Sequence, residues 1–195
     1  MVSPAKGFKT AGDLVAAAKA KPEGLTLASV GVGSATHLSG ERFCFSAGVK
    51  AVHVPFKGGA EAMADVIAGR VDFFFGPVGL VLPLVQAGKL TALAVSGTDR
   101  AAALPDVPTT REAGFTDAEY PIWFGLFAPA KTPLPILDAL HDQTLKALQA
   151  SGVRDKLSAL GVDPMVMTRI DFATYVEKQF AVNAALVKAI GMKPE

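Results

Sequence analysis

Apolar and polar positions in the first half of the chain follow two patterns. Short apolar runs bounded by glycine or proline are typical of buried strands, and apolar positions three or four residues apart are typical of amphipathic helices. Strands that alternate with helices form right-handed βαβ units, so the pattern predicts an α/β fold with a parallel sheet. The predicted strands are 25–30, 50–54, 71–75 and 90–95, and the predicted helices are 10–21, 34–48, 60–68 and 78–87.

The second half of the chain begins with a different kind of apolar run. Tyr120 to Phe127 is apolar on both faces, as a central strand must be. Helices are predicted over 133–150, 153–160 and 170–190, with a strand over 162–167. We therefore expect a complete α/β lobe over residues 10–118 and the C-terminal part of a second α/β lobe over residues 119–195.

Three glycine-containing loops, at residues 31–34, 57–59 and 76–77, each follow a predicted strand. The carboxyl ends of parallel strands lie at one edge of their sheet, and open α/β sheets bind ligands outside that edge. The spacing therefore predicts that the three loops form one binding edge.

The first loop reads SVGVGSATH over residues 29–37. Gly31 and Gly33 begin the G-x-G-x-x-G fingerprint of dinucleotide-binding folds, but the third glycine position is Thr36, and the next strand lacks the acidic residue that a ribose requires. What remains is a helix N-terminus with free backbone N–H groups beside two hydroxyls, which suits a small anion such as a carboxylate. Alternatively, Ser34 serves only to cap the helix.

Composition narrows the classes of partner. Nineteen basic and 18 acidic residues give a net charge of +1, so we expect neither nucleic acid nor anionic lipid as a partner. The single cysteine, Cys44, excludes an internal disulfide and leaves the compartment open. The longest apolar run, Phe73 to Val85, contains two prolines and is shorter than the roughly 18 residues that span a bilayer. The first residues lack the pattern of a signal peptide.

Four side chains could carry chemistry. His37 lies in the first turn of a predicted helix, where the helix dipole opposes protonation and favours a neutral hydrogen-bonding role over a catalytic one. His53 lies in a strand and is interpreted as structural. Cys44 lies near phenylalanines, which favours inert packing over a nucleophilic role. Lys57 could supply charge to a carboxylate, but a loop lysine is solvated by default.

Two other pairs have alternative interpretations. Glu61 and Asp65 share one helix face without a third carboxylate or histidine, so no metal site is expected. Trp123 and Phe124 either line a cleft or pack in a core. No catalytic triad is predicted anywhere in the chain.

Short motifs run along the chain in a fixed order. They are SVGVGS at 29–34, THL at 36–38, GE at 40–41, HVPFKG at 53–58, GRVD at 69–72, GKL at 88–90, PDVPT at 105–109, EAG at 112–114, WFG at 123–125 and AP at 128–129. Together they resemble the Bug or TctC family, the solute receptors of tripartite tricarboxylate transporters. The resemblance extends from about Thr10 to the GMKP sequence at 191–194.

The resemblance implies a fold like that of type II periplasmic binding proteins, in which two α/β lobes close on a small carboxylate. It implies a periplasmic protein that catalyses no reaction, needs no cofactor and presents its ligand to the permease subunits in the membrane. Relatives begin with a signal peptide and a further segment. The resemblance therefore implies that the N-terminal part of the second lobe is absent here, and we expect weak binding.

The resemblance also implies which residues hold the ligand. Relatives grip the carboxylate with backbone groups and waters at loops that match the first two here, and we add the third loop of the predicted edge. The candidate ligand-binding residues are Gly31, Gly33, Ser34, Ala35, Thr36, Phe56, Lys57, Gly58, Gly59, Gly76 and Pro77. The chain departs from the family at Phe56, which is usually tyrosine, and at Gly76, which is often Asp or Asn.

Two other classes of function stay open at this point. An effector-sensing regulatory domain of the same broad fold is the main alternative, and an enzyme that uses Cys44 or His37 is a third. The 119–195 part should also leave an apolar face uncovered, which predicts self-association as a two-fold homodimer around Trp123 and the final helix.

Overall fold

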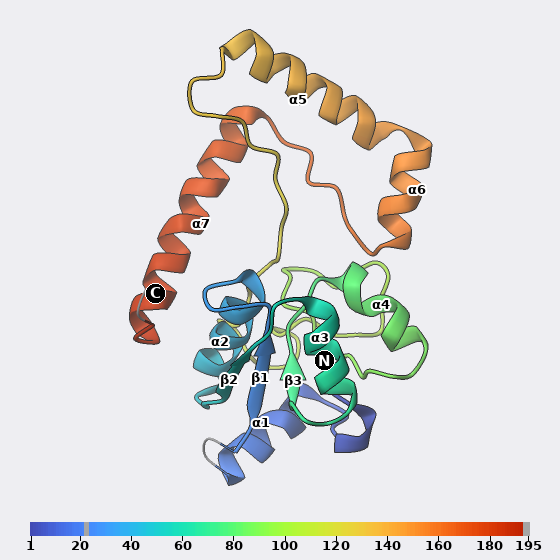
Figure 1. The fold of residues 1–195 in the computed structure, drawn as a ribbon, viewed down its shortest axis with the longest axis vertical. Helices are drawn as coiled ribbons and strands as arrows, with labels where there is room; N and C mark the ends of the chain where they lie inside the picture. The colour runs from blue at the N-terminus through green and yellow to red at the C-terminus, as the bar shows by residue number, and fades with distance from the viewer. Residues whose placement is uncertain (22–23, 193–195) are drawn as a thin grey trace.

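The computed structural model describes residues 1–21 and 24–192, which form an α/β unit and an arm of three helices (Figure 1). We call α5, α6 and α7 the helical arm. The α/β unit contains η1 (Pro4–Lys6), α1 (Ala11–Ala20), β1 (Thr26–Ser29), α2 (Ala35–Ala47), β2 (Val52–Pro55), α3 (Gly59–Ile67), β3 (Phe73–Phe74) and α4 (Val78–Gln86). The helical arm contains α5 (Leu134–Gln149), α6 (Ser151–Ala159) and α7 (Arg169–Ala189).

The helices begin and end where local sequence requires. At the start of α1, the Asp13 amide donates to the Thr10 hydroxyl and the Thr10 amide donates to the Asp13 carboxylate, which completes a capping box. Helix α2 ends at Gly48, whose φ of 64° is in the left-handed region that favours glycine. All seven predicted α-helices are confirmed, with ends that differ by a few residues.

The sheet is parallel, in the order β2-β1-β3. Thr26 pairs with Val52 across β1 and β2, and Leu27 pairs with Phe73 across β1 and β3. Three predicted strands and the α/β class are therefore confirmed, with β1 in the centre.

The predicted strand over 90–95 is wrong. Thr91 pairs with Val2, through two backbone hydrogen bonds of 3.0 and 2.9 Å, and Val95 pairs with Thr109. These are isolated bridges, whereas a strand needs successive pairs along a ladder. Val2 also bridges Phe73, so residues at the start of the chain occupy the edge of β3.

The predicted strands over 120–127 and 162–167 are also wrong. Neither segment pairs with a strand among the residues that the structure describes. Phe124, Leu126 and Phe127 are 79, 68 and 63% exposed, so this run is not buried on both faces as expected. Apolar composition allows a strand, but only a neighbouring strand can satisfy its backbone groups. Residues 120–127 instead lead from the α/β unit to the helical arm, and residues 162–167 join α6 to α7 (Figure 1).

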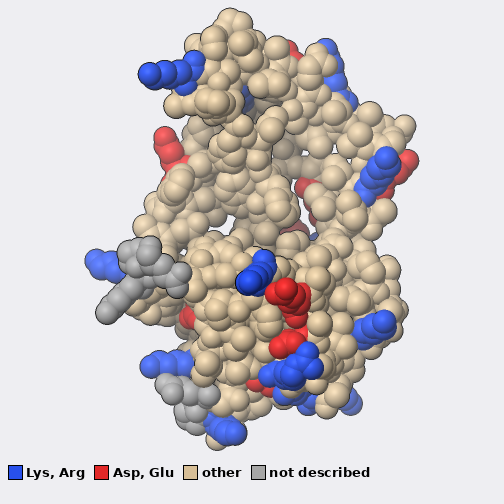
Figure 2. Space-filling model, in the orientation of Figure 1, with Lys and Arg blue, Asp and Glu red and all other residues tan. Residues whose placement is uncertain are grey.

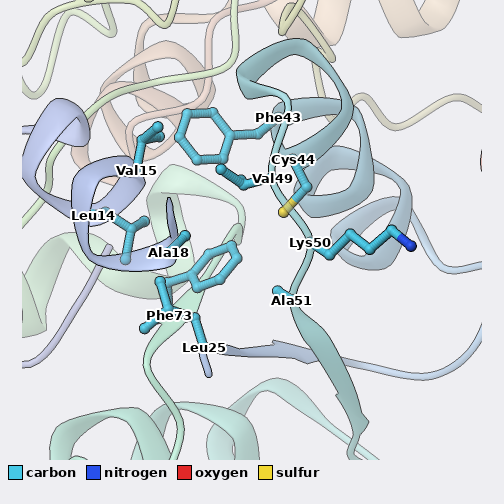
Figure 3. A pocket seen from close by; sticks show the side chains of 10 residues that line it. All are labelled: Leu14, Val15, Ala18, Leu25, Phe43, Cys44, Val49, Lys50, Ala51 and Phe73. Atoms are coloured by element: carbon cyan, nitrogen blue, oxygen red, sulfur yellow. The ribbon is translucent and has the colours of Figure 1, made fainter. Parts of the chain in front are cut away.

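The main core lies between α1, α2 and the sheet. Phe43 packs edge-on against Phe73, and Leu14 of α1 is buried in the same cluster. A cavity of about 10 Å³ lies among these side chains (Figure 3). Cys44 also lines this cavity, and burial, with a smaller contribution from Glu41, raises the pKa of its thiol to about 12. The thiol is therefore protonated at neutral pH, as an inert packing role requires.

Asp72 ties three segments together at the start of β3. Its carboxylate pairs with the Lys6 ammonium at 2.7 Å and accepts hydrogen bonds of 2.8 Å from both the amide and the hydroxyl of Thr26. Burial by itself would raise the pKa of this carboxyl group, but the Lys6 and Thr26 hydrogen bonds outweigh burial, and the pKa lies below its ordinary value.

The helical arm makes little core of its own. No residue of α5 or α6 is buried, and Leu186 is the buried residue of α7. Leu186 packs with Leu38 of α2 and with Tyr120, which attaches the C-terminal end of α7 to the α/β unit (Figure 1). Trp123 packs edge-on against Phe172 of α7, with ring centroids 5.9 Å apart.

Candidate functional site at the carboxyl edge of the sheet

The three predicted loops follow β1, β2 and β3, and all lie at the carboxyl edge of the parallel sheet. The pairing of β1 with β2 extends to the start of the second loop, because the Phe56 amide donates to the carbonyl of Ser29, the last residue of β1, at 2.9 Å. Gly59 and Leu80 show that the second loop also approaches α4, since a Cβ atom on Gly59 would lie 2.5 Å from Leu80 Cδ2. The topology therefore places the starts of α2 and α3 on adjacent strands.

Several amides of the first loop are used within the protein. The Gly31 amide donates to the Ser29 hydroxyl at 3.1 Å, the Gly33 amide donates to His37 Nδ1 at 3.1 Å, and the Ser34 amide donates to the Gly31 carbonyl at 3.2 Å. These bonds fix a compact turn in which Gly31 and Gly33 both have positive φ, 124° and 72°.

The hydroxyls of the first loop also have internal partners. Ser34 accepts a hydrogen bond from the His37 amide at 3.3 Å and lies 2.7 Å from the Gly31 carbonyl, to which it donates. Ser34 therefore caps α2. Thr36 is buried, and its hydroxyl accepts from the Val30 amide at 3.0 Å. The amides of Ala35 and Thr36, in the first turn of α2, have no acceptor within the helix.

The second loop contains one apolar and one charged side chain. Phe56 packs against the core cluster that contains Phe74, so its ring is held by the protein. Lys57 is exposed. Gly58 is the N-cap of α3 and has no side chain with which to cap it, so the first amides of α3, from Gly59 onward, also lack an acceptor within the helix.

The third loop faces a different space. Gly76 and Pro77 line a hollow of about 1280 Å³ between the α/β unit and the helical arm, with Trp123 and Phe127 among the other lining residues. Figure 2 shows that the molecule is open here, with charges of both signs scattered over this face. Residues 31–36 and 56–59 are not among those that line the hollow. The sheet edge therefore aligns all three loops, but only the third faces the large hollow.

Two histidines lie behind the first loop. The rings of His37 from α2 and His53 from β2 stack with centroids 3.5 Å apart and planes 7° apart. His53 Nε2 lies 2.6 Å from the Ser29 hydroxyl, and His37 Nε2 lies 3.6 Å from a Glu41 carboxylate oxygen. Burial and the neighbouring His37 lower the pKa of His53 from 6.5 to about 4, and Glu41 opposes them. His53 is therefore neutral at pH 7.

Two residues near this edge, Ser96 and Thr98, were not predicted from the sequence. Ser96 accepts from the Ser39 hydroxyl of α2 at 3.3 Å and donates to the Tyr120 carbonyl at 2.9 Å, so it links the α/β unit to the connecting segment. Thr98 follows in the same loop and, like Ser96, lines the hollow. Their position after the apolar run over 90–95 was the signal that could have identified them.

Metal binding and membrane crossing are the two other properties to consider in the part of the chain that the structure describes. Within it, no group of three or more His, Cys, Asp or Glu side chains could hold a metal ion. None of the helices there is both long enough and apolar enough to cross a membrane.

A parallel sheet with glycine loops and open helix N-termini at its carboxyl edge defines a class of ligand-binding α/β proteins, and the solved structures that this chain resembles include periplasmic binding proteins. Residues 1–192 match the family described as "Tripartite tricarboxylate transporter family receptor". The chain therefore belongs to this family, whose members are solute receptors and not enzymes.

Curated relatives include a UPF0065 protein from Pseudomonas sp. (strain P51), which is 36% identical over 83% of this chain and 49% of the relative. Protein BugT from Bordetella pertussis is 30% identical over 92% of this chain and 55% of BugT. The chain thus spans about half the length of the curated relatives it matches.

Two solved structures of similar proteins contain carboxylates. One is R. palustris Rpa4515 with adipate, which has a TM-score of 0.89 and 30% identity, over 100% of this chain and 65% of that one. The other is MatC (Rpa3494) from Rhodopseudomonas palustris with bound malate, with a TM-score of 0.80 and 29% identity, over 92% of this chain and 62% of that one. The periplasmic binding protein BugD has a TM-score of 0.82 and 28% identity, over 96% of this chain and 64% of BugD.

Proposed function

We propose that this chain forms a carboxylate-binding part of a periplasmic receptor, which delivers a small carboxylate to the membrane permease of a tripartite tricarboxylate transporter. The observation that carries the proposal is the placement of the α2 and α3 N-termini on adjacent parallel strands, at the edge where such sheets bind ligands. The adipate and malate bound to similar proteins support a carboxylate as the ligand.

The donors that remain available differ from those that the glycines suggested. Because the Gly33 and Ser34 amides are already bonded, the carboxylate would accept hydrogen bonds from Ala35 and Thr36 in α2 and from Gly59 in α3. Lys57, which is exposed beside them, would add positive charge. Gly31, Gly58 and the remaining predicted residues would shape the loops.

The number of donors limits the affinity. Three charge-assisted hydrogen bonds at about 1.5 kcal/mol each give about 4.5 kcal/mol, before the ligand loses translational and rotational freedom. Micromolar affinity needs about 8 kcal/mol. We therefore expect this chain by itself to bind adipate in the millimolar range.

Replacement of Ala35 by proline tests the proposal at a single donor. Proline at the first position of a helix removes the N–H without breaking the helix. Proline also restricts the residue before it to extended backbone, and Ser34 already has φ −64° and ψ 158°. Loss of one charge-assisted bond should weaken adipate binding about tenfold. The measurement is saturation-transfer difference NMR with adipate, with uncharged adipamide as the ligand control.

Ser151→Pro is the matched protein control for that experiment. Ser151 is the exposed first residue of α6, outside the candidate site, and Ala150 before it is also extended. This variant should bind adipate as the wild type does. Equal adipate binding by Ala35→Pro and wild type, or equal saturation transfer to adipamide and adipate, would contradict the proposed site.

We also propose that a second copy of the chain covers the apolar face formed by Phe124, Leu126 and Phe127. These side chains are 79, 68 and 63% exposed, and soluble monomers rarely leave large apolar patches in water. Sedimentation velocity at micromolar concentration should show a dimer for the wild type and a monomer for Phe127→Asp. Phe45→Asp, which changes an exposed phenylalanine on α2, should remain dimeric. A monomeric wild type would refute this interface.

A further inference from the structure

The stacked imidazoles of His37 and His53 each contact the first loop, His37 through the Gly33 amide and His53 through the Ser29 hydroxyl. His37 comes from the first turns of α2, and His53 comes from β2, on the neighbouring strand to β1. His37 is buried, and Ser29, which contacts His53, is fully buried at the end of β1. The ring pair therefore joins α2 to β2 beside the first loop.

The hydrogen bond from Gly33 indicates which ring nitrogen of a neutral His37 carries the proton. The Gly33 amide donates to His37 Nδ1 at 3.1 Å, so Nδ1 must carry a lone pair and no proton. The proton of a neutral His37 is then on Nε2, which faces the Glu41 carboxylate at 3.6 Å. A second proton on Nδ1 would place one donor against another and break the bond to Gly33.

His53 holds the other end of the loop through Ser29. The Ser29 hydroxyl lies 2.6 Å from His53 Nε2 and accepts the Gly31 amide at 3.1 Å. The two histidines thus hold the amides of the positive-φ glycines of the first loop, Gly33 directly and Gly31 through the Ser29 hydroxyl.

We propose that His37 and His53 are positioning residues for the first loop: as a neutral stacked pair they hold Gly31 and Gly33 so that the first amides of α2 point outward toward a carboxylate. This inference rests on the proposed function for its effect on binding. Its effect on the loop itself does not depend on any ligand.

The charged neighbours of the stacked pair come from few elements. Glu41, on α2, is the charged group that faces His37, and Glu41 and His37 are the groups that act on His53. Strand β1 has no ionisable side chain over Thr26–Ser29, and α7 meets α2 where Leu186 packs with Leu38. Burial and the neighbouring His37 disfavour a charged His53 ring, so a proton added to His53 would weaken the stack and the contact with Ser29.

Two variants of His37 separate positioning from bulk packing. In His37→Asn the side-chain oxygen occupies the place of Nδ1 and can accept the Gly33 amide, whereas His37→Leu fills a similar volume without an acceptor. We expect His37→Leu to bind adipate at least tenfold more weakly than wild type and His37→Asn to bind within threefold.

The Gly33 amide gives a readout that needs no ligand. Its hydrogen exchange in the unliganded protein should accelerate in His37→Leu, which has no acceptor at the place of Nδ1, and should stay close to the wild-type rate in His37→Asn. Equal exchange of the Gly33 amide in His37→Leu and wild type, or His37→Leu that is folded and binds adipate as wild type does, would overturn the inference. No adipate binding by the wild type at pH 7.5 would instead refute the proposed function, while the exchange of the Gly33 amide would still decide the positioning role.

Discussion

His53 should make the stability of the protein depend on pH in a window that its neighbours define. Its pKa is about 4 in the folded protein and 6.5 in an ordinary environment, because burial and His37 disfavour the charged ring. Above pH 6.5 the ring is neutral in both the folded and unfolded states and contributes no pH dependence. Between pH 6.5 and about 4 the unfolded state binds more protons, so the free energy of unfolding falls as the pH falls. Below pH 4 this loss is complete.

The size of the loss follows from the two pKa values. A pKa difference between 6.5 and about 4 corresponds to at most about 3 kcal/mol of differential stability. His53 is only partly buried, so solvent screens part of the interaction, and we expect a loss of about 1–2 kcal/mol.

Urea unfolding at pH 7.5 and pH 4.5 measures the effect, with His53→Gln as the non-titrating reference. Glutamine can still reach the Ser29 hydroxyl, and carboxylates elsewhere titrate equally in both proteins, so their contribution cancels in the comparison. Wild type should lose about 1–2 kcal/mol more than His53→Gln between the two pH values. Parallel losses in the two proteins would show that the environment of His53 does not disfavour its charged form, and would refute the reasoning.

Three further changes test the packing and the local structure. Gly40→Ala should destabilise the protein by about 1–2 kcal/mol in thermal unfolding, because a Cβ atom there would lie 2.5 Å from the buried Leu27 side chain. Alanine has the better helix propensity, so a more stable variant would contradict this packing. Thr10→Ala should cost about 1 kcal/mol by loss of the capping box, measured by urea unfolding, and no change would show that the cap contributes nothing. Asp72→Asn should cost about 2–3 kcal/mol at pH 7, and this difference should shrink as the pH falls through the lowered pKa of Asp72; a constant difference would contradict the ionic contribution.

The sequence predicted those parts of the fold whose cause is local. Thr10 and Asp13 lie three residues apart and fix the start of α1, and Gly48 fixes the end of α2 through its backbone alone. Helical periodicity likewise predicted α5 and α7, although these helices bury little. The alternation of strands and helices also predicted the parallel sheet, because βαβ connections leave few other arrangements.

The failures share a nonlocal cause. The apolar run from Tyr120 to Phe127 has the composition of a central strand, but its hydrogen bonds depend on neighbours that composition cannot reveal. At the site, the sequence predicted the glycine loops. It did not predict that the Gly33 amide would donate to His37, or that His53 from β2 would stack on His37. A hydrogen-bonding role for His37 was predicted; its partner could come only from the structure.

The most direct test of the account is a titration of the ¹⁵N-labelled chain with adipate, followed by backbone amide shifts. The account predicts saturable shifts that are largest at Ala35, Thr36 and Gly59, with a millimolar dissociation constant and no comparable response to adipamide. Shifts confined to other parts of the chain, or no shift at adipate concentrations of several tens of millimolar, would contradict a carboxylate site at this edge of the sheet.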